Sequence, residues 1–246
     1  MSEKTTNTAI LLAAGSGSRL RPITNNIPKP MANVNGEMII SRALKNLSNK
    51  GLNNIIIVTG YLGDKIRDFF GSEYKGMGIS YIHNSIYEST NSMYSLWMAL
   101  KALSSNERII VIEGDVFFEE SILDNIPDAD FLWYGDSGIM DMDGCYLTSE
   151  EKKINEIKIY RNNERNKVTD KFLLKSLGLL IIKPKLIDKI VSVLEEDIAN
   201  KKENLYYDLI FAERLNHFNI QAVDVKGKKW FEIDTPEDIK ICEQLL

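Results

Sequence analysis

The stretch AILLAAGSGSRL, residues Ala9–Leu20, decides the fold. Its first six residues form a continuous apolar run, which ends in a Gly-x-Gly loop followed by Arg19. A short apolar run bounded by glycine is typical of a strand buried on both faces of a sheet. Small residues let backbone N–H groups approach an anion closely, and the arginine fork suits phosphate. The stretch therefore predicts a buried strand that ends in a phosphate-binding loop.

Similar runs follow along the first half of the chain. Apolar runs at Ile55–Thr59, Ile79–Ile82 and Ile109–Ile112 alternate with helical patterns at Met38–Lys50 and Ser92–Leu103. Continuous apolar strands separated by helices predict an α/β fold whose parallel sheet is covered on both faces. Ligands of such sheets bind beyond the carboxyl ends of the strands, so we expect the functional site at that edge.

The second half of the chain has a less regular pattern. It predicts strands at Ala129–Tyr134, Cys145–Leu147, Ile154–Tyr160, Ser176–Ile182, Ile220–Val225 and Trp230–Ile233. Helices are predicted at Leu186–Leu194, at Leu205–Leu215 and from Pro236 to Leu246, where proline suits the first turn. We expect the sheet to continue through this half.

Composition excludes several classes of protein. The 246 residues are 44% hydrophobic and 26% charged, which are ordinary values for a globular domain. A net charge of -5 argues against a broad nucleic-acid surface. Residues 1–8 lack the apolar core of a signal peptide, and no apolar run reaches the ~20 residues of a membrane span. We expect a cytoplasmic protein with neither a nucleic-acid partner nor a membrane span.

Two cations and two carboxylates are the candidates for catalysis. Arg19 follows the glycine loop, and Lys29 is held between two prolines. Asp115 follows the fourth apolar run, and Asp234 precedes the last helix. Arg19 and Lys29 can bind phosphate. Magnesium takes one or two carboxylates together with phosphate oxygens, so we expect both aspartates to bind Mg²⁺. The alternatives are a turn at the end of the strand for Asp115 and a helix N-cap for Asp234.

The motif AAGSGSRLRP at Ala13–Pro22, followed by Thr24 and Pro28-Lys29-Pro30, resembles the signature of nucleotidyltransferases that activate sugar 1-phosphates. It is similar, more closely, to the bacterial choline-phosphate cytidylyltransferases; the family often has threonine where Ser18 stands. The resemblance implies a Rossmann-like mixed, mostly parallel sheet flanked by helices, of the glycosyltransferase-A-like nucleotidyltransferase type, with a small strand-rich acceptor-side insert. It implies one domain over residues 1–246, with a nucleotide-binding half at 8–127 and an acceptor-side half at 128–246.

The resemblance implies that Arg19 and Lys29 are catalytic, because the matching residues of the family bind the triphosphate and stabilise the transition state. It also implies which residues seat the nucleotide. These are the end of the first strand and its loop, the glycine and tyrosine that end the second strand, and the polar residues before a helix: Leu12, Ala13, Ala14, Gly15, Ser16, Gly17, Gly60, Tyr61, Ser89, Thr90 and Asn91. The pattern NSMYSL at Asn91–Leu96 is similar to one in the cytidylyltransferases and favours CTP. Capping of the helix is the alternative role of Ser89, Thr90 and Asn91.

The acceptor side carries a weaker pattern. Aromatic faces and a carboxylate hold a quaternary ammonium group, and Trp133, Tyr207, Asp208 and Glu232 are the candidates for such a box. The alternative is that each of these four residues, taken alone, belongs to the core or the surface, which is more common than contact with a ligand. We expect Lys158 to bind the acceptor phosphate, with an exposed strand lysine as the alternative.

These observations lead us to expect Mg²⁺-dependent transfer of a cytidylyl group from CTP to phosphocholine, phosphoethanolamine or a phosphonate, with release of pyrophosphate. The alternative is a sugar-1-phosphate nucleotidyltransferase that uses UTP or dTTP. A non-catalytic nucleotide-sensing module is a remote alternative, because such a module should have lost some of the four charged residues. A homodimer is an open expectation.

Overall fold

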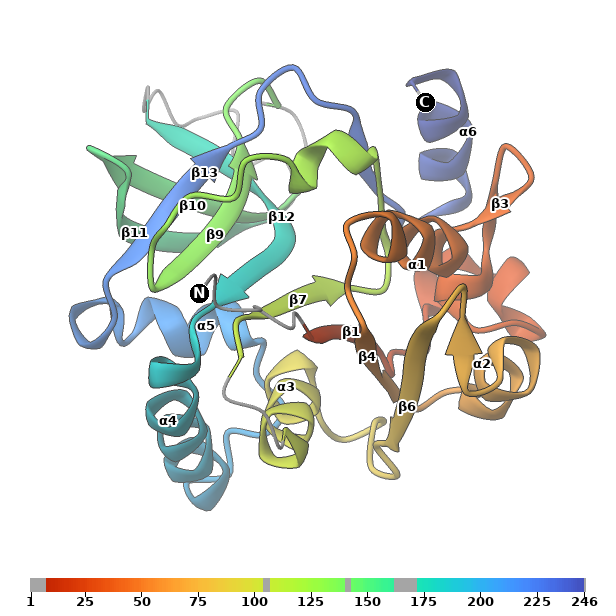
Figure 1. Ribbon diagram of the computed structural model, residues 1–246, viewed down its shortest axis with the longest axis horizontal. Coiled ribbons are helices and arrows are strands. Elements are labelled where there is room, and N and C mark those ends of the chain that lie inside the picture. The colour runs from red at the N-terminus through yellow and green to blue at the C-terminus, as the bar shows by residue number, and fades with distance from the viewer. Residues whose placement is uncertain (1–7, 104–106, 140–142, 162–171, 246) are drawn as a thin grey trace.

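The computed structural model describes residues 8–103, 107–139, 143–161 and 172–245 (Figure 1). The strands are β1 (Thr8–Ala13), β2 (Asn33–Val34), β3 (Glu37–Met38), β4 (Asn54–Thr59), β5 (Glu73–Tyr74), β6 (Met77–His83), β7 (Ile109–Glu113), β8 (Val116–Phe118), β9 (Phe131–Asp136), β10 (Gly144–Glu150), β11 (Lys153–Tyr160), β12 (Leu173–Ile182), β13 (Ile220–Asp224) and β14 (Trp230–Glu232). The α-helices are α1 (Ile39–Asn49), α2 (Gly63–Phe70), α3 (Ser92–Ala102), α4 (Ile187–Ala199), α5 (Tyr207–Ala212) and α6 (Pro236–Leu245).

One large mixed sheet organises the molecule, with strand order β10-β11-β13-β9-β12-β7-β1-β4-β6-β5. Its N-terminal half is parallel over β7, β1, β4 and β6, which run in one direction, and ends in the edge strand β5, which is antiparallel to β6. In this register Ala13 lies opposite Thr59, and Leu12 lies opposite Glu113. The carboxyl ends of β1, β4 and β7 therefore meet at one edge, as the sequence predicts.

The second half of the sheet is built mainly from antiparallel pairs. Strand β12 lies between β7 and β9 and is antiparallel to both, and β10 and β11 form an antiparallel pair. Among the described strands of this half, the parallel pair is β13 with β9. The predicted mixed sheet is thus confirmed, and its parallel pairing is concentrated in the N-terminal half. Strand β10 also pairs with β12, so this end of the sheet curls back on itself.

The alternating side chains of β1 explain the layers on either side of the sheet. Leu11 packs in the cluster that contains the buried faces of α1 and α2, whereas Ile10 packs in the cluster with α3, α4 and α5. Both side chains are at most 1% exposed. Burying such a side chain stabilises the fold by roughly 1.5–3 kcal/mol. In Figure 1 the two groups of helices lie on opposite sides of the strands.

A short second sheet brings the end of the chain back to β7. Strand β14 pairs antiparallel with β8, so that Glu232 lies opposite Val116. The backbone N–H of Ile233 donates to the carbonyl of Asp115 at 2.9 Å. Helix α6 then packs through Ile239 and Cys242 into a separate small cluster. None of the helices in the described ranges is long and apolar enough to cross a bilayer.

Candidate active site

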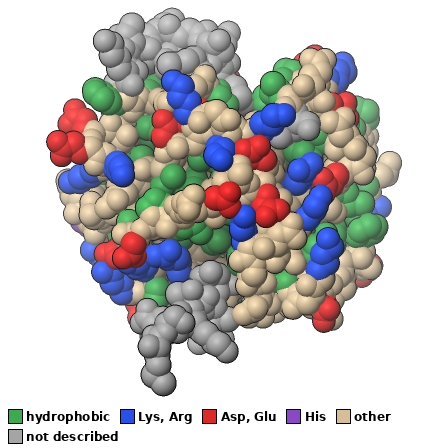
Figure 2. All heavy atoms as spheres, turned by 45° about the horizontal axis from the view of Figure 1, so that its top comes forward, with side chains coloured by type: hydrophobic (Ala, Val, Ile, Leu, Met, Phe, Trp, Pro, Cys, Tyr) green, Lys and Arg blue, Asp and Glu red, His purple; other side chains and the backbone are tan. Residues whose placement is uncertain are grey.

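A cavity of about 650 Å³ opens at the carboxyl ends of β1 and β7 and extends toward β10 and β12. In Figure 2, acidic and basic side chains are interspersed across the middle of one face of the molecule. The predicted site residues that line the cavity are Leu12, Ala13, Ala14, Gly15, Ser16, Gly17, Arg19, Lys29, Thr90, Asn91, Asp115, Asp208, Glu232 and Asp234. The fold thus gathers residues from the whole length of the chain.

The glycine loop is shaped by close contact with Lys29. Gly17 has φ +58, a left-handed conformation that glycine adopts without steric cost. A Cβ atom at Gly17 would lie 2.8 Å from the Cβ of Lys29, so any side chain would displace the lysine. Thr24 donates its hydroxyl hydrogen to the Gly17 carbonyl at 2.8 Å, which holds the loop in this conformation. The loop and Lys29 therefore form one unit.

Gly60 and Tyr61 do not line the main cavity but pack against Ala14 and Thr24 of the loop region. A Cβ atom at Gly60 would lie 2.5 Å from the carbonyl oxygen of Ala14, so only glycine permits this approach. The Tyr61 N–H donates to the same carbonyl at 3.0 Å, and its hydroxyl donates to the Thr24 carbonyl at 2.9 Å. Tyr61 lines a smaller adjoining cavity with Ser16.

The segment before α3 divides into cavity and capping residues. Asn91 lines the cavity and also caps α3, because its Oδ1 accepts from the Ser92 N–H at 2.9 Å. Ser89 does not line the cavity; its hydroxyl donates to the Ile86 carbonyl. Asn84, which sequence reasoning missed, is buried and donates to the hydroxyl of Thr90 at 3.0 Å.

The four predicted charged residues meet around the ammonium group of Lys29. Its Nζ lies 2.7 Å from Asp115 Oδ2 and 2.6 Å from Asp234 Oδ1, and Arg19 reaches the same Asp234 oxygen at 2.9 Å. Burial alone would lower the pKa of Lys29, but the two carboxylates outweigh burial and raise that pKa above its ordinary value. Burial likewise opposes ionisation of Asp234, yet Lys29 and Arg19 hold the pKa of Asp234 below its usual range.

Asp234 is free of the capping role that its position suggests. The hydroxyl of Thr235 accepts from the Asp238 N–H at 3.3 Å, and the Asp238 carboxylate accepts from the Thr235 N–H at 2.6 Å. This reciprocal arrangement is a capping box, with Pro236 in the first turn of α6. The carboxylate of Asp234 is therefore left to face Lys29 and Arg19.

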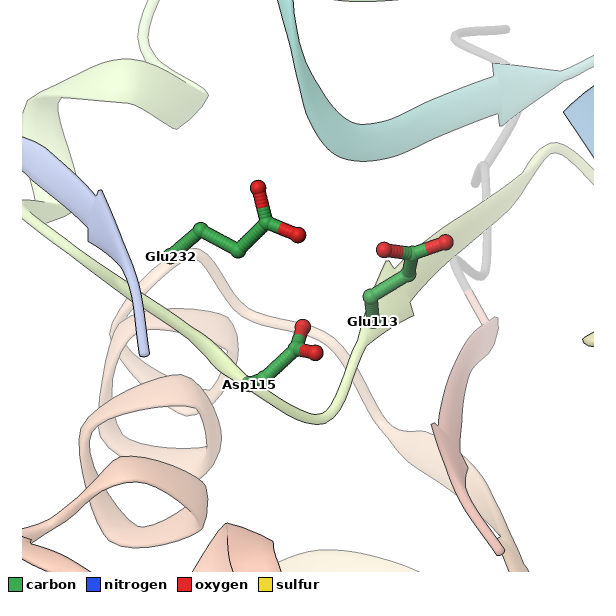
Figure 3. A group of neighbouring side chains, drawn as sticks. All are labelled: Glu113, Asp115 and Glu232. Carbon is green, nitrogen blue, oxygen red and sulfur yellow. The ribbon is translucent and has the colours of Figure 1, made fainter. Parts of the chain in front are cut away.

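Asp115 also belongs to a group of three neighbouring carboxyl groups, together with Glu113 and Glu232 (Figure 3). One oxygen atom from each of Glu113, Asp115 and Glu232 can be chosen so that all lie within 4.8 Å of one another. Burial raises the pKa of Glu113 well above its usual range, and the neighbouring carboxyl groups raise it further. Asp115 Oδ1 is buried and accepts no hydrogen bond from the described residues.

The donor set fits a hard divalent cation. It consists of carboxylate oxygens only, and one of them is buried without a partner among the described residues. Asp234 is not in this group of three, although both it and Asp115 contact Lys29. Gly178 has φ +64, and a Cβ atom there would lie 2.8 Å from Glu113 Oε2. The absence of a side chain at Gly178 therefore leaves room for the Glu113 carboxyl group.

A buried lysine marks the far end of the cavity. Lys175 on β12 is 2% exposed, and its Nζ lies 2.7 Å from Glu232 Oε2. Burial opposes its charge, but Glu232 outweighs burial and raises the pKa of Lys175. Asp208, from the first turn of α5, is 6% exposed and lines the same end. A lysine within the apolar run LLKSLGLLII was the sequence signal that could have revealed Lys175.

The predicted aromatic box is corrected by the structure. Trp133 and Tyr207 are each 0% exposed, belong to the core cluster and do not line the cavity. Trp133 instead donates to the Ser176 hydroxyl at 2.9 Å. The expected role of Lys158 is also corrected: it is exposed and pairs with Glu156 at 3.1 Å. Successive strand residues face opposite sides, so its neighbour Ile159 lines the cavity and Lys158 does not.

Known proteins match the chain along most of its length. It is 26% identical to the choline-phosphate cytidylyltransferase of Streptococcus pneumoniae, over 97% of both chains. It is also 26% identical to the CMP-5'-(3-aminopropyl)phosphonate synthase of Streptomyces rubellomurinus, over 94% of this chain; it spans only 37% of the length of that synthase. A third relative, the CTP:phosphoglutamine cytidylyltransferase of Campylobacter jejuni, is 27% identical over 95% of this chain and 98% of the relative.

Solved structures confirm the fold. The CTP:phosphocholine cytidylyltransferase of Streptococcus pneumoniae superposes with a TM-score of 0.78, covering 97% of this chain and 98% of that one at 24% identity. The inositol-1-phosphate CTP transferase from T. maritima superposes with a TM-score of 0.74 at 20% identity, covering 98% of this chain and 95% of that one. The family model described as nucleotidyl transferase matches residues 8–130. The chain therefore belongs to the nucleotidyl transferase family and is a nucleotidyltransferase.

Proposed function

We propose that this enzyme transfers a cytidylyl group from CTP to a small phosphorylated or phosphonate acceptor and releases pyrophosphate. The observation that carries the proposal is the single cavity in which the glycine loop, the Lys29 cluster and the buried Lys175 face one another. The choice of CTP rests on relatives named for CTP or CMP chemistry that align over nearly the whole chain.

The nucleotide would occupy the end of the cavity formed by β1 and its loop. Backbone N–H groups of a glycine loop bind phosphate oxygens, and Arg19 and Lys29 add positive charge beside them. Lys29 is already ionised and fixed between two carboxylates, so it needs little reorganisation to stabilise charge on the reacting phosphate. Asn84 and Asn91 offer polar side chains to the nucleoside part.

The acceptor would enter from the Lys175 end. At this end Lys175 lines the cavity and Lys158 does not, and the charge of Lys175 suits an acceptor phosphate or phosphonate. An acceptor oxygen is already ionised and attacks the α-phosphorus of CTP directly. The new P–O bond forms as the bond between the α-phosphorus and its bridging oxygen breaks, and pyrophosphate leaves with the electron pair. Catalysis consists of positioning and charge stabilisation, without a covalent intermediate on the protein.

Glu113, Asp115, Glu232 and Asp234 are the residues that would hold magnesium. When bound, the ion would neutralise phosphate charge and hold the reacting groups in line. The orphaned Asp115 Oδ1 is the observation on this chain that supports a cation there.

The test is magnesium-dependent pyrophosphate release. We would assay CTP, UTP, dTTP and ATP, each against phosphocholine, phosphoethanolamine, 2-aminoethylphosphonate and glucose 1-phosphate. We expect release with CTP and a small acceptor. Release only with a hexose phosphate would contradict the proposal. Tight nucleotide binding without turnover on any pair would favour the non-catalytic alternative.

Transfer to a sugar 1-phosphate is the second candidate. A UTP–glucose-1-phosphate uridylyltransferase of Haloferax volcanii is 39% identical over 75 residues, although this covers 30% of this chain and 31% of that protein. The glucose 1-phosphate arm of the assay, with UTP or dTTP as donor, tests this candidate directly.

A further inference from the structure

We infer that Tyr61 is a positioning residue, whose hydroxyl group holds the glycine loop and Lys29 in place without contacting the nucleotide. The inference rests on the phosphate-binding roles proposed for this loop and for Lys29. It depends on a series of contacts that runs from Tyr61 through Thr24 and Gly17 to Lys29. The resemblance of the sequence implies instead that Tyr61 seats the nucleotide directly, and the two roles predict different results.

The hydroxyl group of Tyr61 is committed to the backbone of a neighbouring turn. It donates to the Thr24 carbonyl at 2.9 Å and lies 3.4 Å from the Asn25 carbonyl. Tyr61 does not line the main cavity, and it lines the smaller cavity together with Ser16. Because a phenol has a single O–H donor, this hydroxyl has no second hydrogen to offer to a nucleotide.

Thr24 connects this turn to the glycine loop. It is 0% exposed, and its hydroxyl donates to the Gly17 carbonyl at 2.8 Å, which also accepts from the Leu20 N–H at 3.0 Å. Gly17 lies between two side chains, because a Cβ atom there would be 3.1 Å from Thr24 Cγ2 and 2.8 Å from Lys29 Cβ. The space between Gly17 and Lys29 is smaller than a methyl group, so a shift of Thr24 would also move the lysine.

Tyr61 is itself fixed in position. Its N–H donates to the Ala14 carbonyl at 3.0 Å, and its ring packs edge-on against the ring of Tyr87 with 6.4 Å between the centroids. Lys65, in the first turn of α2, holds the same turn through a hydrogen bond from its Nζ to the Asn26 carbonyl at 2.6 Å. The residues around the start of α2 therefore support the turn that carries Thr24.

The position of Lys29 matters because its charge is already compensated. Its ammonium group lies 2.7 Å from Asp115 and 2.6 Å from Asp234, so a small displacement would weaken both contacts. Preorganised charge stabilises a transition state, and a displacement of about 1 Å can reduce a rate by about 100-fold. Loss of one neutral hydrogen bond at a distance should shift Lys29 less, and we expect an effect of about three- to tenfold.

The first test is Tyr61→Phe, with Tyr81→Phe as the matched control. The Tyr81 hydroxyl also donates to a backbone carbonyl, that of Gly71 at 2.7 Å, but Tyr81 does not line the cavity. Pyrophosphate release is measured with the substrate pair that the wild type uses best. We expect Tyr61→Phe to lower kcat by about three- to tenfold and Tyr81→Phe to change it by less than about twofold, with similar melting temperatures for the two variants. Equal kcat values for the two variants would overturn the inference.

The choice of nucleotide separates positioning from direct contact. We would measure the Kd of CTP, UTP, dTTP and ATP, each with magnesium, by calorimetry for the wild type and Tyr61→Phe. The four nucleotides share the triphosphate, so a displaced loop and lysine should weaken each of them by the same factor. A loss that differs between CTP and ATP would show that Tyr61 contacts the base and would overturn the inference.

The second test places Tyr61→Phe in the Lys29→Ala background. If Tyr61 acts through Lys29, its hydroxyl has no effect once the lysine side chain is gone, and we expect Tyr61→Phe to change kcat and nucleotide Kd by less than about 1.5-fold there. The same three- to tenfold loss in both backgrounds would show that Tyr61 acts independently of Lys29 and would reject the positioning role.

The inference and the proposed function fail in different ways. A preference for UTP or dTTP would contradict the proposed choice of CTP and would leave the comparison between Tyr61→Phe and Tyr81→Phe valid. CTP-dependent turnover that is as fast in Tyr61→Phe as in the wild type would keep the proposed function and reject the positioning role. A wild type that binds none of the four nucleotides would reject both.

Discussion

The nucleotide end of the cavity and its acceptor end treat charge differently. At the nucleotide end, Arg19, Lys29, Asp115 and Asp234 are joined by ion pairs of 2.6–2.9 Å, so the protein neutralises its own charges. At the proposed acceptor end, Lys175 pairs with Glu232 at 2.7 Å, whereas Asp208 forms no ion pair among the described residues.

We infer from this difference that one end of the cavity binds the triphosphate common to all nucleotides and that the other end selects the acceptor. Every nucleoside triphosphate has the same phosphates, so a glycine loop and a compensated charge cluster serve them all. Acceptors differ in size and charge, so we expect their recognition to depend on the cavity-lining side chains from β10, β12 and α5. The predictions below test this separation.

The largest effect is expected from Asp115→Asn. Removing one carboxylate charge weakens the group of carboxyl groups that would hold magnesium, and we expect pyrophosphate release to fall by about 10³-fold or more. A magnesium titration of the initial rate measures it, and magnesium should raise the melting temperature of the wild type more than that of the variant. Unchanged turnover would remove Asp115 from the metal site.

Lys29→Ala should be nearly as damaging. It removes charge stabilisation at the reacting phosphate, and we expect kcat to fall by about 10²–10³-fold with every acceptor. Lys158→Ala is the matched control, because Lys158 is exposed on β11 and faces away from the cavity; it should change kcat less than about twofold. If Lys29→Ala had only a small effect, confined to the KM of the acceptor, Lys29 would bind the acceptor and would not stabilise the reacting phosphate.

A smaller effect is expected from Gly17→Ala. The new Cβ atom would collide with Lys29, and the positive φ adds strain of about 1 kcal/mol. We expect kcat to fall by about tenfold, since a displacement of about 1 Å at a catalytic group has effects of this order or larger. Gly36→Ala has a similar φ of +78 but open space around it, so it should cost stability without loss of rate. Equal kcat values for Gly17→Ala and Gly36→Ala would show that the close contact of Gly17 with Lys29 does not matter for the rate.

Trp133→Phe should have the smallest effect on activity. The ring lies in the core, and the variant loses the hydrogen bond to Ser176, which contributes about 1 kcal/mol. We expect a lower melting temperature and KM values for CTP and acceptor that stay within about twofold of the wild type. A selective rise in the acceptor KM would restore Trp133 to the acceptor site.

The sequence was most informative where the residues of a functional feature are adjacent in the chain. The apolar run before Gly15 predicted β1 and its loop, because the strand and the loop are adjacent in sequence. The predicted meeting of Asp115 and Asp234 depends on two strand ends, and the pairing of β14 with β8 brings them together.

The acceptor end was harder to predict because orientation and burial are collective properties. On β11, the burial pattern alternates imperfectly, so the sequence alone did not show that Ile159 rather than Lys158 faces the cavity. Trp133 and Tyr207 carry the residue types of an aromatic box, yet the core uses the same types. Lys175 on β12 is covered by Gly144 of β10 and by Glu232 of β14, which come from other segments of the chain.

The ion pair between Lys29 and Asp234 also has a consequence for the order in which the enzyme is made. The two residues are 205 positions apart, and Asp234 follows the last strand. A chain emerging from the ribosome has its glycine loop and Lys29 long before it has Asp234 or Glu232. The parallel half of the sheet can therefore assemble early, whereas the charge cluster closes only when β14 pairs with β8. Activity should be among the last properties that the growing chain acquires.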